Sequence, residues 1–211
     1  LAQYAINYKI DEINPMVSAM SYIGYDVWTM GNHEFNFLPG QRDTQVLFAE
    51  DEGISCLSGN VTLLEDGLNV HGDKAKAGEP FYQPYEIFTF KFDDGLKAKV
   101  AVIGLGNAAN ANWDLATNYP NLSFSSLENK DGILANEIDK WVEVVRNKEK
   151  ADIVIVAVHS GLGSADSFSL ESQTLMAAQA TSGVDLIICG HDHQANITVT
   201  KNSVGEDVTI V

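Results

Sequence analysis

The chain has 211 residues, of which 45% are hydrophobic and 20% are charged, and its formal net charge is −16. This composition is normal for a folded domain, and no apolar stretch approaches the roughly 20 residues that span a bilayer. Because so acidic a surface repels a nucleic-acid backbone, we expect no binding of a nucleic-acid duplex.

Turn and capping residues delimit the expected elements in the first half of the chain. Asn14-Pro15 opens a helix, as an N-cap followed by proline at the first helical position, and Gly24 closes this helix. An apolar strand over residues 25–30 then leads into the loop 31–34. The pattern next predicts a helix over about 41–50, a strand over 54–57 and a polar surface excursion over 62–84. A hairpin follows: its first strand, with Phe88, Phe90 and Phe92 alternating with polar residues, is half-buried, and its second strand spans 99–105.

The last third of the chain repeats a strand followed by a helix. An amphipathic helix over 133–145 precedes a strand over 152–158, and a helix over about 169–180 precedes a strand over 185–189. Both strands read as fully buried. Strands of this kind that alternate with helices indicate an α/β fold, to which the hairpin adds antiparallel character.

The two cysteines favour buried free thiols. Cys56 and Cys189 each lie in an apolar run, where a free thiol behaves as a small hydrophobic group. A disulfide between them remains the alternative.

Four of the five histidines directly follow an apolar strand, in short loops that contain glycine: His33, His159, His191 and His193. The fifth, His71, lies in a polar segment, and we interpret it as a surface residue. Ligands bind at the carboxyl ends of strands in open α/β sheets, so we expect the three strand ends to converge. Each histidine alone is most often an ordinary loop residue. As a set, with an asparagine oxygen nearby and no cysteine, they predict a site for Mn, Zn, Fe or Co.

Three blocks carry a family resemblance. In chain order, residues 31–34 (GNHE), 158–161 (VHSG) and 190–193 (GHDH) resemble the last three signature blocks of the calcineurin-like metallophosphoesterases. The longer stretch 26–37 is similar to the branch of 5′-nucleotidases and 2′,3′-cyclic-nucleotide 2′-phosphodiesterases, and Asn36 resembles the cyclic phosphodiesterase/3′-nucleotidase type. The resemblance covers essentially the whole chain. It implies a layered α/β/β/α sandwich with mixed sheets, and a two-metal enzyme that hydrolyses nucleotide phosphoesters.

The resemblance also implies a role for each site residue. Asn32, His159 and His191 would bind one divalent ion, and His193 would bind the other. His33 would bind no metal but would stabilise the transition state or protonate the leaving oxygen. Glu34 would orient His33. The two ions, of Mn, Zn, Fe or Co, would supply a hydroxide for attack on phosphorus.

The chain departs from the family pattern at its N-terminus. The family's Asp-x-His block and its Gly-Asp block, whose aspartate bridges the two metals, do not occur before Gly31, where the only aspartates are Asp11 and Asp26. We therefore expect residues 1–211 to be a partial catalytic domain, incomplete at the N-terminus and with negligible activity alone. The chain starts at Leu1 rather than methionine and stops on an apolar run, which also suggests a piece of a longer protein. By resemblance, that protein would carry a C-terminal nucleotide-binding domain and would lie outside the cell, in the cell wall or in the periplasm.

Several functions remain open. The leading interpretation is hydrolysis of 2′,3′-cyclic nucleotides and 3′-nucleotides, and the first alternative is a 5′-nucleotidase or nucleotide-sugar hydrolase of the same family. A non-catalytic metallophosphoesterase-like module that binds a partner or a nucleotide is the second alternative. The third is a structural zinc site, which would leave His33 unexplained.

Overall fold

The computed structural model of the chain describes residues 12–124 and 133–211. Asp11, one of the two aspartates upstream of Gly31, lies outside these residues. In the described part of the chain, no helix is long and apolar enough to cross a bilayer.

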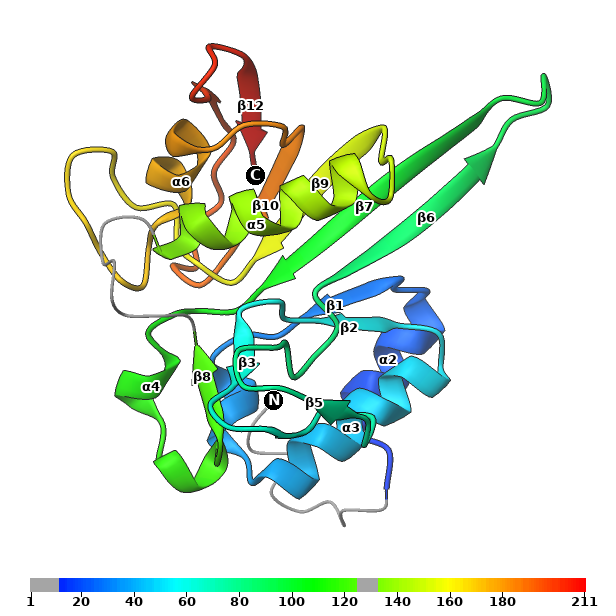
Figure 1. The fold of residues 1–211 in the computed structure, drawn as a ribbon, viewed down its shortest axis with the longest axis vertical. Helices are drawn as coiled ribbons and strands as arrows, with labels where there is room; N and C mark the ends of the chain where they lie inside the picture. Colours follow the sequence, from blue (N-terminus) through cyan, green and yellow to red (C-terminus); the bar gives the residue numbers. More distant parts are fainter. Residues whose placement is uncertain (1–11, 125–132) are drawn as a thin grey trace.

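One sheet of six strands dominates the second half of the chain (Figure 1). Its central strands run parallel to one another, and an antiparallel strand lies at each edge. The sheet is therefore mixed, as the sequence predicted. In spatial order its strands are β11 (Thr198–Lys201), β12 (Asp207–Ile210), β10 (Leu186–Cys189), β9 (Ile153–Val158), β7 (Lys97–Leu105) and β6 (Tyr85–Lys91).

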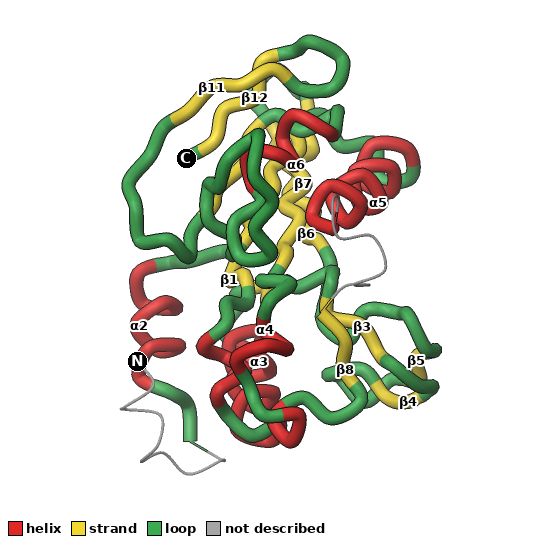
Figure 2. Tube along the Cα trace, turned by 90° about the vertical axis from the view of Figure 1, so that its left-hand side faces the viewer, coloured by secondary structure: helices red, strands yellow, loops and turns green. Residues whose placement is uncertain are grey.

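Two helices cover one face of this sheet. Helices α5 (Ile133–Asn147) and α6 (Thr174–Ala180) lie on the same side of it in Figure 2, and Ile138 of α5 shares one core with Val156 of β9. On the other face, Ile153 is 42% exposed and Ile188 is 45% exposed. The expectation of fully buried strands is therefore wrong on that face. That face is only partly covered. The short strands β1 (Val27–Thr29) and β2 (Ser55–Leu57), which lie against it, contact mainly β7 and β6.

A second layer of strands and helices builds the first half of the chain. Strands β1 (Val27–Thr29) and β2 (Ser55–Leu57) pair in parallel, and helices α2 (Pro15–Ile23) and α3 (Pro39–Asp51) lie beside them. The predicted caps of α2 are confirmed: the Asn14 side chain accepts a hydrogen bond from the Met16 amide, and Gly24 ends the helix with a φ of +88°. The helices and the two sheets together give the α/β/β/α order that was expected.

The two sheets meet at Gly104 of β7 and Leu57 of β2. A Cβ atom at Gly104 would lie 3.0 Å from the backbone carbonyl carbon of Leu57, closer than side-chain carbons normally approach. The Gly104 carbonyl accepts a hydrogen bond from the Gly59 amide at 2.8 Å. Only glycine allows the sheets to approach this closely, so the position sets the distance between them.

The polar excursion over 62–84 is more ordered than its composition suggested. It contributes the short strands β3 (Val61–Leu63), β4 (Gly67–Leu68) and β5 (Lys74–Ala75), and β3 pairs with β8 (Leu122–Phe124). Its Tyr82 is only 2% exposed, and the hydroxyl of this residue donates a hydrogen bond to Asp43 Oδ1 at 2.7 Å. The polar composition of this segment did not predict that Tyr82 is buried, because its hydrogen-bond partner Asp43 lies on α3.

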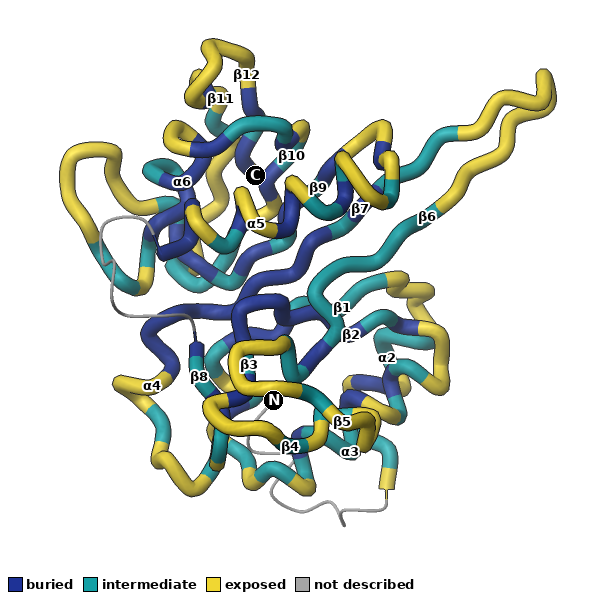
Figure 3. Tube along the Cα trace, viewed as in Figure 1, coloured by how far each residue is buried: buried dark blue, intermediate teal, exposed yellow. Residues whose placement is uncertain are grey.

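The exposure of the hairpin and the start of helix α6 also differ from the expectation. The hairpin of β6 and β7 projects from the body of the protein (Figures 1 and 3), so Phe90 and Phe92 are 52% and 54% exposed rather than half-buried. Helix α6 begins at Thr174 instead of 169, because the preceding loop bonds back to the end of β9 through Ser160 and Gly161. Cys56 and Cys189 are free thiols, as predicted, although Cys189 is only partly buried.

We predict that Gly104→Ala destabilises the protein by about 1–3 kcal/mol, because the added methyl group overpacks the contact with Leu57. Thermal unfolding followed by circular dichroism would measure the change. Gly190→Ala is the matched control, since a Cβ at Gly190 meets no atom within 4 Å. Equal melting temperatures for the two variants would contradict the role assigned to Gly104.

Candidate metal centre

Three strand ends meet at the Nε2 atom of His159. Asn32 follows β1, His159 follows β9 and His191 follows β10. Asn32 Oδ1 lies 2.7 Å from His159 Nε2, and His191 Nδ1 lies 3.3 Å from the same nitrogen. The structure therefore brings together three side chains that the sequence separates by 127 and 32 positions.

The loop after β10 is held in an uncommon conformation. His191 has a φ of +101° and His193 a φ of +56°, and each such non-glycine residue costs about 1–3 kcal/mol. Asp192 stabilises the turn, because its Oδ2 atom accepts a hydrogen bond from the Leu162 amide at 3.0 Å. The loops after β9 and β10 are thus fastened to each other, which fixes His159 relative to His191.

Glu34 contacts the backbone of the loop that carries Asn32 and His33. Its Oε2 atom accepts a hydrogen bond from the Gly31 amide at 2.7 Å, and burial raises the pKa of its carboxyl group. A Cβ at Gly31 would lie 3.0 Å from this oxygen and 3.1 Å from His159 Cε1. The structure pairs His33 with Asn36, and the role of Glu34 in orienting His33 stays a prediction.

His33 begins a short 3-10 helix, η1 (His33–Asn36), and its side chain is exposed. The Nδ1 atom of His33 lies 2.8 Å from Asn36 Oδ1. His193 is also exposed. Both histidines lie near enough to His159 for their charges to act on its titration, so four histidines share one site.

Burial first, and then the neighbouring His191, His33 and His193 in that order of effect, together lower the pKa of His159 to about 4. The ring is therefore neutral at pH 7. A neutral imidazole can bind a metal ion without first releasing a proton.

The site includes three residues that sequence reasoning missed. The Trp113 ring stacks on His191, with ring centroids 5.3 Å apart and planes inclined at 21°. Glu171 Oε2 lies 3.5 Å from His191 Nε2, and Asp114 Oδ1 accepts a hydrogen bond from Asn36 Nδ2 at 2.6 Å. All three lie in loops or at helix ends, where no periodic pattern marks them. Trp113 ends α4 (Asn110–Trp113), a short helix between β7 and β8.

The donor atoms of this cluster fit one divalent ion. Neighbouring ligand atoms around an ion bound at about 2.1 Å lie about 3 Å apart, close to the observed separations of 2.7 and 3.3 Å. Two imidazoles and an amide oxygen suit a first-row transition metal. His191 keeps its Nε2 atom beside Glu171, as metal-bound histidines commonly place their second nitrogen near a carboxylate.

The described residues do not complete a second ion site. Within 12–124 and 133–211, no group of three or more His, Cys, Asp and Glu residues is arranged to hold a metal. The cluster at His159 is of a different kind, because one of its donors is the amide oxygen of Asn32.

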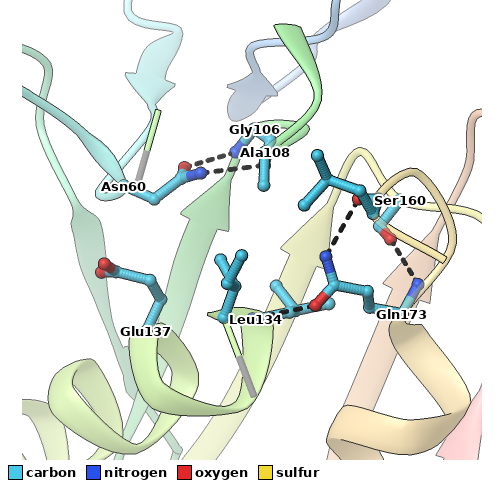
Figure 4. A pocket seen from close by; sticks show the side chains of 9 residues that line it. Asn60, Gly106, Ala108, Leu134, Glu137, Ser160 and Gln173 are labelled. Atoms are coloured by element: carbon cyan, nitrogen blue, oxygen red, sulfur yellow. Dashed lines mark hydrogen bonds between the residues drawn. The ribbon is translucent and has the colours of Figure 1, made fainter. Parts of the chain in front are cut away.

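A small cavity lies beside the end of β9 (Figure 4). It is lined by nine residues and has a volume of about 10 Å³, room for one water molecule. Figure 4 shows Asn60 bonded to the backbone of Gly106, and Gln173 bonded to Ser160. Because it is so small, we do not assign substrate binding to this cavity.

We predict that His159 titrates near pH 4 in the metal-free chain, and that His191→Ala moves its pKa upward because a neighbouring positive charge is removed. An NMR titration of the ring protons measures both values. The unfolded chain protonates a histidine at about pH 6.5. This group's contribution to folding stability is therefore present above pH 6.5 and is lost as the pH falls towards 4. A midpoint near 6.5 in the folded chain would contradict the buried, neutral state.

Comparison with known proteins agrees with the geometry. The sequence profile of the calcineurin-like phosphoesterases matches residues 3–195. The trifunctional nucleotide phosphoesterase protein YfkN of Bacillus subtilis is 28% identical over 92% of this chain and 12% of that protein. The 2′,3′-cyclic-nucleotide 2′-phosphodiesterase/3′-nucleotidase of Yersinia enterocolitica is 27% identical over 88% of this chain and 26% of its own length. The 5′-nucleotidase of Vibrio cholerae is 27% identical, over 88% and 29% respectively.

A solved structure shares the fold. The crystal structure of the calcineurin-like phosphoesterase YfkN from Bacillus subtilis matches with a TM-score of 0.70 and 26% identity, over 91% of this chain and 54% of that chain. The present chain spans between 12% and 29% of the three curated relatives. It belongs to the calcineurin-like phosphoesterase family, whose members typically use divalent metal ions.

Proposed function

We propose that the whole protein is a metal-dependent hydrolase of nucleotide phosphoesters, with 2′,3′-cyclic nucleotides and 3′-nucleotides as its substrates. The observation that carries the proposal is the convergence of Asn32 Oδ1 and His191 Nδ1 on His159 Nε2, at 2.7 and 3.3 Å. The names of the relatives from Yersinia enterocolitica, Haemophilus influenzae and Salmonella typhimurium support this substrate class.

The residues of the cluster have separate tasks in this proposal. Asn32, His159 and His191 hold one divalent ion, of Mn, Zn, Fe or Co. When bound, such an ion neutralises phosphate charge and lowers the pKa of a coordinated water. His159 is neutral at pH 7 and is therefore ready to bind the ion. A bound cation also explains how a chain of net charge −16 can attract an anionic ester.

His33 acts on the substrate rather than on the metal. Its Nδ1 atom is engaged by Asn36, so its Nε2 atom is the one left to contact the phosphoester. There it stabilises the charge that develops on phosphorus or protonates the departing ribose oxygen, effects that typically contribute about 10²–10⁴-fold in rate.

A second ion completes the proposed site in the whole protein. His193 contributes one ligand to it, and residues beyond the described part of the chain contribute the others. We therefore propose that residues 1–211 alone hydrolyse phosphoesters negligibly.

Two alternatives can be tested, and the first also has support from a relative. The relative from Vibrio cholerae is named a 5′-nucleotidase, so a panel of cyclic, 3′- and 5′-nucleotides should be assayed on the full-length protein. Metal analysis tests a non-catalytic binding module, because a degenerate site would not retain two ions.

We expect His159→Ala to lower manganese-dependent turnover of 2′,3′-cyclic AMP by more than about 100-fold in the full-length protein, because a central ligand is removed. His71→Ala is the control, since His71 is an exposed histidine that pairs with Glu50 at 2.7 Å. Retained turnover in His159→Ala would refute the proposed role of the cluster. Equal turnover by residues 1–211 and by the full-length protein would refute the need for a second set of ligands.

A further inference from the structure

Asp114 comes from a distant part of the sequence and extends the local pair of His33 and Asn36 into one hydrogen-bonded chain. Asn36 Oδ1 lies 2.8 Å from His33 Nδ1, and Asn36 Nδ2 donates to Asp114 Oδ1 at 2.6 Å. Asn36 is the last residue of η1, whereas Asp114 follows α4 and is 78 positions away. The fold, rather than a local motif, therefore creates this chain.

The carboxylate at one end determines the direction of every hydrogen bond. An ionised carboxylate can only accept hydrogen bonds, so the amide group of Asn36 must turn its NH₂ towards Asp114. Its carbonyl oxygen then faces His33 and can only accept. His33 must therefore carry a proton on Nδ1, whether the ring is neutral or doubly protonated, and Nε2 is left for the substrate.

The opposite arrangement would disable His33 as an acid. If Asn36 turned over, its NH₂ would face Nδ1, which would then need a lone pair. A doubly protonated ring would place two hydrogens against each other at this point. The direction that Asp114 imposes thus keeps both protonation states of His33 compatible with its surroundings.

Asp114 is held in place by its own backbone, and this placement carries a cost. Its amide donates to the Asn110 carbonyl at 3.2 Å. Within the described residues, its buried Oδ2 atom has no hydrogen-bond partner, which is unfavourable for stability. The preceding residue, Trp113, stacks on His191. The end of α4 thus touches the metal cluster and the His33 chain at once.

We propose that Asp114 is a positioning residue which, through Asn36, fixes the Nδ1–H form and the orientation of His33 so that Nε2 faces the phosphoester. The last step rests on the proposed function, whereas the Nδ1–H assignment rests on the hydrogen bonds alone. When the ester bond to phosphorus breaks, the proton on Nε2 passes to the ribose oxygen and the ring remains as the neutral Nδ1–H form. The water that attacks phosphorus replaces the proton consumed.

A charge-relocation experiment tests this role. Asp114→Asn preserves the shape of the side chain but removes its acceptor-only character, so Asn36 is no longer held in one orientation. Asn36→Asp alone places two carboxyl groups where a 2.6 Å hydrogen bond now lies, which is repulsive. In the double variant Asn36→Asp/Asp114→Asn, the carboxylate accepts directly from His33 and from the new amide, so the Nδ1–H form returns.

The first readout is ¹⁵N NMR of the His33 ring in metal-free residues 1–211, which distinguishes a protonated from an unprotonated ring nitrogen. We expect the Nδ1–H form in the wild type, a gain of the Nε2–H form in Asp114→Asn, and recovery in the double variant. A merely structural role for Asp114 would not be rescued by moving the charge to position 36. An Nε2–H form in the wild type, or an unchanged ring in Asp114→Asn, would overturn the proposal.

The second readout is turnover by the full-length protein with manganese. We expect Asp114→Asn to lower kcat for a 3′-nucleotide about 10–100-fold with KM unchanged, and to lower kcat much less for p-nitrophenyl phosphate, whose leaving group needs no proton. Asp93→Asn, an exposed residue in the hairpin turn, is the charge-matched control. Equal losses on both substrates would overturn the proposal. The expected ring forms without hydrolysis by any variant would instead refute the proposed function and leave the Nδ1–H assignment standing.

Discussion

Asn32 Oδ1 lies 2.7 Å from His159 Nε2, and this contact joins the ends of strands that belong to different sheets. It depends on how closely the two sheets pack. Gly104 lets β7 approach β2 at Leu57, and β7 is the neighbour of β9, which carries His159. A shift between the layers would separate the donor atoms, so the close packing of the two sheets at Gly104 and Leu57 underlies the chemistry of the site.

Several features of the site are locally unfavourable for folding stability. His191 and His193 have positive φ angles, Glu34 is a buried acid, and one oxygen of Asp114 is buried without a described partner. Costs of this kind concentrate at functional sites, where the surrounding fold enforces them. Here the surrounding fold is the pair of loops fastened by Asp192 and the glycine at position 31, which leaves space for His159 and Glu34.

Sequence reasoning reached the residues whose position follows from a local pattern. The helix caps at Asn14 and Gly24, the alternation of strands and helices in the last third and the histidines at strand ends all follow from such patterns. It failed where long-range contacts decide. Tyr82 is buried in a segment that reads as polar because Asp43 lies across from it, and Phe90 is exposed because the hairpin extends beyond the sheet.

The same limit applies inside the site. His33 and Asn36 could be singled out by their motif, but the link from Asn36 to Asp114 could not. Nothing in the sequence links Asn36 to Asp114, since the two are brought together only by the placement of α4 beside η1. Trp113 escaped notice for the same reason, since its stacking partner His191 lies far along the chain.

Anomalous diffraction from crystals of the manganese-loaded protein tests the central claim most directly, because it locates the ion independently of any activity. The account predicts a Mn²⁺ ion bonded to Asn32 Oδ1, His159 Nε2 and His191 Nδ1, with His33 outside the coordination sphere. An ion bound elsewhere, or one bound through His33, would contradict it.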